Sequence, residues 1–136
     1  MIALHSLKLL HKFNLVRLFF PVFKNEEVKF LGLKLSNRLG TAAGLDKNGD
    51  FIDSLGSLGF GFLEVGTVTP KPQIGNPKPR VFRVFDEEAI INRLGFNNKG
   101  VDYLVRRLQK KKFQGIVGVN IGANKTSQGQ KRIDDY

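Results

Sequence analysis

The chain has 136 residues, 41% of them hydrophobic and 25% charged, which is the composition of one globular domain and excludes a disordered tail. It contains no cysteine, which excludes a disulfide scaffold, a thiolate metal site and a cysteine nucleophile, and with two histidines no metal site is expected. The 22 Lys and Arg residues against 12 Asp and Glu residues give a net charge of +10, which favours an anionic partner: phosphate, nucleic acid or a membrane surface.

Residues 1–24 form a basic, apolar leader without a carboxylate. Lys8 and Lys12 interrupt its apolar stretches, so the pattern predicts neither a membrane span nor a signal peptide. One predicted helix, ending at Pro21, carries an apolar stripe made of Leu9, Phe13, Val16 and Phe20. Two interpretations stay open: a surface helix that covers a core, or an interfacial helix with its stripe in lipid and its lysines at anionic headgroups.

The following segment begins a β-α-β unit. Residues 28–35 contain two short apolar runs around a glycine and predict a hairpin, and residues 39–43 predict a short buried strand. After the polar, glycine-rich loop 44–49, Asp50 is the expected N-cap of a helix through Leu58.

The rest of the chain continues this alternation of strands and helices. Residues 60–66 are almost continuously apolar, which is typical of a strand covered on both faces. Prolines exclude a regular element over residues 70–79, and residues 80–91 predict a projecting hairpin. An amphipathic helix over residues 101–108 and a third buried strand over residues 115–121 follow. The pattern predicts an α/β fold with a parallel sheet.

Polar side chains follow the predicted parallel strands: Asp46 and Lys47 come after the first, Thr67 after the second, and Asn120 at the end of the third. Parallel α/β folds carry their sites at this carboxyl edge, in open sheets and in (β/α)8 barrels alike. Because three strands cannot close a barrel, the chain is expected to be either a small open fold or part of a larger barrel.

Amide side chains in the second half of the chain both donate and accept hydrogen bonds, which suits a flat polar heterocycle. Turn formation is the alternative role for each of them. They are Asn92, Asn97, Asn98, Asn120 and Asn124. No dinucleotide fingerprint in the right context, P-loop or Ser-His-Asp arrangement is found in the sequence.

Four segments of the chain closely resemble dihydroorotate dehydrogenase: residues 42–47, 64–70, 91–98 and 118–122. Together with the leader, they make the chain similar to the membrane-associated, quinone-using class. The resemblance implies an incomplete α/β fold, the N-terminal part of a (β/α)8 TIM barrel preceded by a short helical extension. Residues 1–27 are then the extension on the membrane and quinone side, and residues 28–136 are the first part of the FMN-binding barrel.

The same resemblance implies FMN as the cofactor and assigns residues to the site. The expected flavin contacts are Ala43, Gly44, Leu45, Asp46, Lys47, Thr67 and Asn120. The expected substrate contacts are Lys47, Asn92, Arg93, Leu94, Gly95 and Phe96. Arg83 is expected to face the quinone tunnel. The catalytic base of this class is a serine on a motif beyond Tyr136, so no catalytic residue is expected within the chain.

The resemblance implies the oxidation of dihydroorotate to orotate in pyrimidine biosynthesis. The base removes the C5 proton, hydride passes from C6 to flavin N5, and a quinone reoxidises the flavin. The 136 residues alone are expected to be inactive. The expected location is the cytoplasmic face of a bacterial cell membrane, or the mitochondrial inner membrane in a eukaryote.

A non-catalytic module that binds through its basic charge or adheres to a membrane is the alternative. The net charge of +10 favours such a module. Nucleic acid is not an expected partner, because aromatic and basic residues do not interleave along the sequence.

Overall fold

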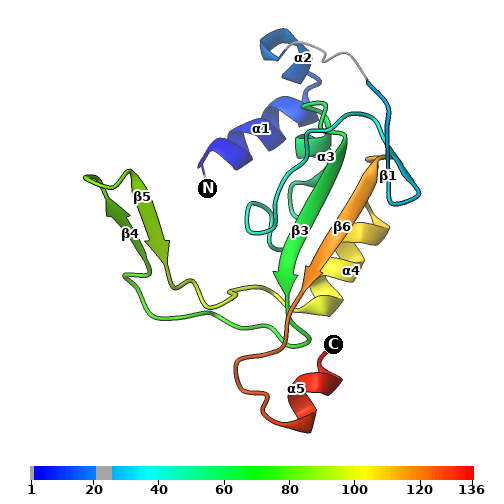
Figure 1. Ribbon diagram of the computed structural model, residues 1–136. Helices are drawn as coiled ribbons and strands as arrows, with labels where there is room; N and C mark the ends of the chain where they lie inside the picture. Colours follow the sequence, from blue (N-terminus) through cyan, green and yellow to red (C-terminus); the bar gives the residue numbers. More distant parts are fainter. Residues whose placement is uncertain (1, 21–25) are drawn as a thin grey trace.

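The computed structural model describes residues 2–20 and 26–136. The helices are α1 (Ile2–Lys12), α2 (Val16–Phe19), α3 (Ile52–Gly56), α4 (Val101–Gln109) and α5 (Gln130–Asp134). The strands are β1 (Val28–Phe30), β2 (Leu33–Leu35), β3 (Phe62–Val68), β4 (Val81–Val84), β5 (Ala89–Asn92) and β6 (Ile116–Ile121). Figure 1 shows this order along the chain.

Strands β3 and β6 form a parallel pair, with Phe62 opposite Ile116 and Val65 opposite Val119. The parallel arrangement predicted from the sequence is therefore confirmed. Full burial of β6 was the wrong expectation, since Val119 is 40% and Ile121 53% exposed. Within the described ranges no strand pairs with the second edge of β6, so its outer side chains have no neighbours to cover them.

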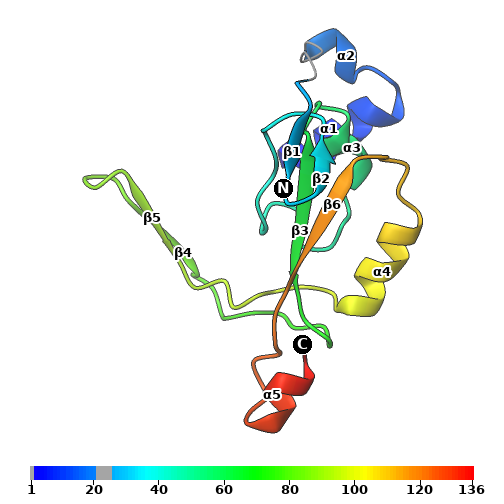
Figure 2. The same ribbon diagram turned by 45° about the vertical axis from the view of Figure 1, so that its right-hand side comes forward.

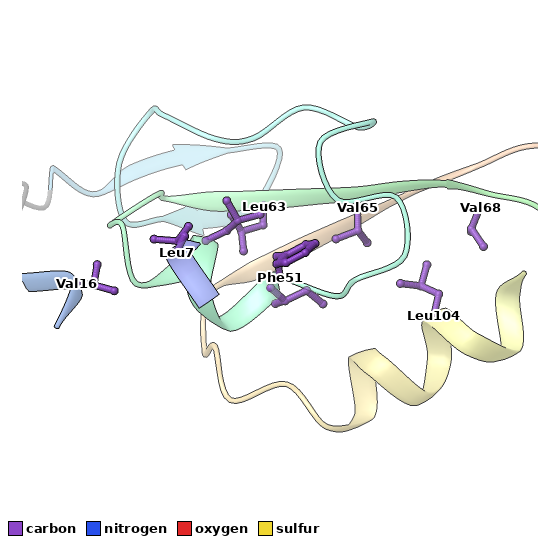
Figure 3. Close-up of a cluster of buried hydrophobic side chains, with 9 residues drawn as sticks. Leu7, Val16, Phe51, Leu63, Val65, Val68 and Leu104 are labelled. Carbon is purple, nitrogen blue, oxygen red and sulfur yellow. The ribbon is translucent and has the colours of Figure 1, made fainter. Parts of the chain in front are cut away.

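One hydrophobic core joins β3 to the helices that precede it in the chain, α1, α2 and α3, and to α4, which follows it. Leu63, Val65 and Val68 of β3 are each at most 3% exposed and face Leu104 of α4 and the side chains around α3. Figure 3 shows these residues together with others of the same cluster, whose buried members among the described residues are Leu7, Val16, Phe51, Ile52, Leu55, Leu63, Val65, Val68 and Leu104. Burial of this apolar surface fixes α1 against α3 and α2 against α1, and α3 in turn packs on β3.

The single N-terminal helix predicted from the apolar stripe is two helices in the structure. The chain leaves the helical path between α1 and α2, and Asn14 has a φ of 56°, a left-handed conformation that asparagine tolerates better than most residues. The stripe divides at this break: Val16 is 4% exposed and belongs to the core, whereas Leu9 and Phe13 are about 60% exposed. The expected helix end at Pro21 lies outside the described residues. Within those residues, no helix is both long and apolar enough to cross a membrane.

The strand expected over residues 39–43 is reduced to one bridge, between Gly40 and Phe62. The N–H of Gly61 donates to the carbonyl of Leu39 at 2.8 Å, but the next donor, the N–H of Glu64, bonds to the hydroxyl of Thr41 at 3.0 Å. A side-chain acceptor therefore replaces the backbone acceptor that a regular ladder needs. The hairpin expected over residues 28–35 is confirmed as β1 and β2.

The N–H groups that precede α3 are bound by a different aspartate than the sequence predicts. Asp50 makes no cap, and α3 ends at Gly56 rather than Leu58. The carboxylate of Asp46 instead accepts the N–H of Asp50 at 2.9 Å through one oxygen and the N–H of Phe51 at 2.7 Å through the other. Asp46 thereby accepts the backbone N–H groups of the two residues that precede α3, although it lies four and five residues before them in the chain.

Replacing Asp46 with asparagine should lower the free energy of unfolding by about 1–3 kcal/mol, because one buried N–H loses its oxygen acceptor. Asp53→Asn is the matched control: one oxygen of Asp53 accepts both the Lys112 and Phe113 N–H groups, and asparagine keeps such an oxygen. Urea unfolding followed by circular dichroism measures both variants. Equal losses in the two variants would contradict the capping role of Asp46.

The stability of the parent chain should also depend on the charge of Asp46. Burial raises the pKa of this carboxyl group, so the folded chain holds the proton more strongly than the unfolded chain does. The resulting stabilisation is complete below the unfolded pKa and is lost as the pH rises through the folded pKa. The Asp46→Asn variant should lack this part of the pH dependence.

Strands β4 and β5 form the predicted hairpin and project from the rest of the molecule in both Figure 1 and Figure 2. Phe82 pairs with Ile91 and Arg83 with Ile90. The proline-rich segment before the hairpin is irregular, as expected, and is tied to the following loop by a bridge between Gln73 and Asn98.

Candidate functional site

The loop of residues 44–47 lies against the carboxyl end of β3. The N–H of Gly44 donates to the carbonyl of Gly66 at 2.8 Å, and the N–H of Gly66 donates to the carbonyl of Asp46 at 3.2 Å. Gly66 has a φ of 103°, and a Cβ atom there would lie 2.3 Å from the carbonyl oxygen of Asn120 in β6. Glycine is therefore required where the loop and both strands meet.

Thr67 and Asn120 meet at the same edge, one from each parallel strand. The Thr67 hydroxyl donates to Oδ1 of Asn120 at 2.6 Å, and Nδ2 of Asn120 donates to Oε1 of Glu64 at 3.3 Å. Both Thr67 and Asn120 are half-buried. The sheet register thus joins two of the predicted flavin residues into one polar pair at the edge where parallel α/β proteins bind ligands.

Lys47 provides a positive charge beside this edge. Its ammonium group donates to Oδ1 of Asn97 at 2.8 Å. Burial lowers the pKa of Lys47, and the nearby guanidinium of Arg80 lowers it further. Arg80 is held in place by hydrogen bonds from Nη1 to the carbonyls of Ile74 at 2.9 Å and Asn76 at 3.1 Å. Two cations kept close together in this way form an environment that attracts an anion.

Sequence reasoning missed Arg80 as a member of the site. It lies directly after the irregular proline-rich segment, where no periodicity indicates which side chains face inward. The folding of that segment brings the charge of Arg80 within electrostatic range of Lys47, although the two residues are separated by about thirty positions in the sequence. No local signal in the sequence could have found it.

The predicted substrate segment, residues 92–96, runs from the end of β5 toward Asn97. Asn92 and Phe96 are exposed, and Gly95 has a φ of 72° with no room for a Cβ beside Asn76. The guanidinium of Arg93 donates to the Pro79 carbonyl at 3.1 and 3.3 Å, so this side chain secures the base of the hairpin. Leu94 and Gly95 are half-buried.

The amide residues divide between contacts with predicted site residues and structural hydrogen bonds. Asn98 is 7% exposed; it accepts the N–H of Gly100 at 2.8 Å, which closes a turn, and donates to the Thr69 hydroxyl at 2.8 Å, which links two distant segments. Asn124, equally buried, both donates to and accepts from the backbone of Lys71. Asn97 and Asn120 instead contact predicted site residues.

The remaining predicted positions differ in exposure. Nothing lies within 4 Å of the place where a Cβ of Gly44 would stand, and its φ is 102°. Ala43 is half-buried and Leu45 is 49% exposed. Arg83 is exposed in β4, away from the loop of residues 44–47 in sequence. Within the described ranges, no group of three or more His, Asp or Glu side chains could hold a metal ion.

Comparison with known proteins identifies the family. The family model described as dihydroorotate dehydrogenase matches residues 26–136. The dihydroorotate dehydrogenase (quinone) of Buchnera aphidicola subsp. Schizaphis graminum is 53% identical over 97% of this chain and 41% of the relative. The enzyme of the same name from Neisseria meningitidis serogroup A is 52% identical over 98% of this chain and 39% of the relative. The chain therefore spans about two fifths of the length of these relatives.

Solved structures agree with the sequence comparison. Ligand-free DHODH from Eimeria tenella superposes with a TM-score of 0.78 at 37% identity, over 98% of this chain and 39% of that one. The Eimeria tenella DHODH complex with ferulenol gives a TM-score of 0.73 at 38% identity, over 94% of this chain. The predicted fold class, an incomplete part of an α/β barrel, is thereby confirmed, as the described residues form no closed barrel. By its sequence and its fold alike, this chain belongs to the dihydroorotate dehydrogenase family.

Proposed function

We propose that this chain provides part of the FMN contacts and part of the substrate contacts of a quinone-dependent dihydroorotate dehydrogenase, which oxidises dihydroorotate to orotate in pyrimidine biosynthesis. The observation that carries the proposal is the meeting of Lys47, Asn97 and the Thr67–Asn120 pair at the carboxyl edge of the parallel strands. The names of the matching relatives support it.

The residues at this edge fit a flavin. Gly44 leaves open space above the backbone, which allows close approach of a flat ring, and the Lys47 ammonium can stabilise negative charge on that ring. The Thr67 hydroxyl and the Asn120 amide supply polar groups for the ring edge. When bound, FMN would accept a hydride from the substrate and pass the electrons to a second acceptor. Ala43, Leu45 and the backbone of Asp46 complete the proposed cradle.

The same edge suits an anionic pyrimidine substrate. Lys47 and Arg80 together attract a carboxylate, and the Asn97 amide keeps the Lys47 ammonium in a defined position. The exposed amide of Asn92 can donate to and accept from a pyrimidine edge. Residues 93–96 shape the rest of this proposed pocket with their backbone.

The projecting hairpin is the proposed quinone side. Arg83 pairs across it with Ile90, and the next pair on the same face joins Val81 to Asn92. This face of the hairpin therefore carries Asn92, the proposed substrate amide, at one end and Arg83 farther along. Arg83 lies between the apolar side chains of Val81 and Ile90, an environment that suits the polar head of a quinone. With the exposed apolar residues of the leader, it supports peripheral contact with the cytoplasmic face of a bacterial membrane, or with the mitochondrial inner membrane in a eukaryote.

Replacing Gly44 with alanine tests the proposed cradle. The variant is made in a chimera in which residues 1–136 replace the matching segment of the Neisseria meningitidis relative. A methyl group in the open space should weaken FMN binding at least about tenfold, because the ring can no longer approach the backbone. Flavin absorbance per protein chain after dialysis measures the retained FMN.

Gly32→Ala is the matched control, since Gly32 has a φ of 78° and equally open surroundings but lies in the turn between β1 and β2. It imposes a similar backbone strain far from the carboxyl edge and should leave FMN binding unchanged. Retention of FMN by both variants would contradict the proposal that the flavin ring lies against the backbone at Gly44. Loss of FMN from both would assign the effect to strain.

A further inference from the structure

A cavity of about 960 Å³ opens between α1, α3 and the chain that follows α4. Helices α1 and α3 lie side by side in both Figure 1 and Figure 2. None of the residues proposed for the flavin or the substrate lines this cavity. Its volume is in the range of small-molecule sites. It is therefore a concave surface whose lining shares no residue with the proposed site at the carboxyl edge.

The lining of this cavity is strongly basic. Its Lys and Arg residues are Lys8, Lys12, Arg107, Lys110, Lys111 and Lys112. Among the described residues that line it, two carry carboxylates, Asp50 and Asp53. Since like charges gathered around one concavity repel one another, such a lining needs a compensating anion.

The two carboxylates are already engaged within the protein. Asp50 accepts the hydroxyl of Tyr103 and forms ion pairs with Lys99 at 3.2 Å and Arg107 at 3.6 Å. Asp53 accepts the backbone N–H groups after α4. With six Lys and Arg side chains against two carboxylates, the described lining keeps an excess of four positive charges.

Three ammonium groups remain for a ligand. In residues 2–20 and 26–136, neither a hydrogen bond nor an ion pair engages the side chains of Lys12, Lys110 and Lys112; Lys12 only lies over the Phe13 ring at 5.8 Å. Lysines at the end of α4 also suit the negative end of the helix dipole, which accounts for Lys110. The dipole does not account for Lys12, which reaches the same cavity from α1.

We infer that this cavity binds a phosphate ester, whose anionic oxygens are held by Lys12, Lys110 and Lys112. A lysine ammonium is a compact charge suited to phosphate oxygens. Lys8 and Arg107, which also donate hydrogen bonds to the carbonyls of Asp50 and Gly49, add to the positive potential of the cavity. The apolar walls formed by Phe51 and Phe113 accommodate the organic part of the ester. A soluble metabolite and a phospholipid headgroup share this chemistry.

The test uses the 136-residue chain and two probes, glycerol 3-phosphate and vesicles of phosphatidylglycerol. Glycerol 3-phosphate up to about 10 mM, where a site of millimolar affinity is mostly occupied, should shift the amide resonances of the lining residues in NMR spectra. The variant K12Q/K110Q/K112Q should bind it at least about tenfold more weakly. The single variant K12Q should give a smaller loss in the same direction.

A variant with the same net charge is the control. K29Q/K78Q/K131Q removes three exposed lysines that do not line the cavity, and its affinity should stay within about twofold of the parent. Circular dichroism checks that both triple variants are folded. Equal weakening in the two variants, shifts confined to residues outside the cavity, or no shift at all would each overturn the inference.

The vesicle arm distinguishes the two sources of the phosphate. Sedimentation with phosphatidylglycerol vesicles that glycerol 3-phosphate reverses, and that the cavity variant alone loses, assigns the site to a lipid headgroup. Saturable binding of glycerol 3-phosphate without sedimentation assigns it to a soluble ester. Sedimentation that both triple variants keep, without a response to glycerol 3-phosphate, contradicts the inference.

Discussion

In the chimera, Lys47→Ala should slow the oxidation of dihydroorotate by about 100-fold while the protein stays folded. The ammonium group is half-buried and donates to Asn97, and Arg80 lies close enough to disfavour its charge, so it is placed for a ligand rather than for the core. Its loss removes the charge proposed to face both the flavin and the anionic substrate. Steady-state turnover with saturating quinone measures the effect.

The pH profile separates this role from simple damage to the site. Since burial and Arg80 lower the pKa of Lys47, activity that needs the ammonium should decline as the pH rises through that lowered value. Lys47→Arg keeps a charge at all accessible pH values and should lack this decline, even at a lower rate. The control is Lys34→Ala. Lys34 is an exposed lysine in β2 that forms an ion pair with Glu27, and its replacement should leave the rate unchanged. A normal rate in Lys47→Ala would contradict the assignment.

Gly66→Ala should destabilise the chain by about 3 kcal/mol and abolish FMN binding in the chimera. A methyl group at this position would lie 2.3 Å from the Asn120 carbonyl oxygen, a backbone atom in the paired strand, and a φ of 103° disfavours any residue with a side chain. The strands would have to separate where Thr67 and Asn120 meet. Urea unfolding and retained flavin absorbance measure the two effects.

Gly118→Ala is the control within the same pair of strands. Gly118 lies opposite Glu64, and its added Cβ would stay 3.8 Å from its nearest neighbours, an ordinary contact. The chain should tolerate this change within about 0.5 kcal/mol. A Gly66→Ala protein as stable as Gly118→Ala would show that the sheet edge can relax, and the required close approach at Gly66 would be wrong.

Local chemistry explains what could be predicted. The hairpins over residues 28–35 and 80–91 and the strand over residues 60–66 follow from turn residues and continuous apolar runs, which act over a few neighbouring positions. The position of Thr67 and Asn120 at the ends of parallel strands was also enough to bring them to one edge, because parallel strands end together. The loop that carries Lys47 reaches the same edge through its hydrogen bonds with Gly66.

Long-range contacts decided the rest. The helical spacing of the leader did not reveal that Val16 enters the core whereas Phe13 stays exposed, because the break at Asn14 depends on packing against α3 and the sheet. Asp46 and Asp50 are equally good caps by residue type, and only the return of the loop to β3 gives Asp46 the two N–H groups.

By itself, the sequence determined the family, the β-α-β alternation over most of the chain and the edge of the sheet that carries the candidate site, because motifs and periodicities are properties of short segments. Only the tertiary structure decided which side chains meet there. Arg80 beside Lys47, Asn97 rather than Asn98 at the ammonium, and the basic cavity under α1 all join residues far apart in the chain. Such contacts depend on how the segments pack, which no local pattern encodes.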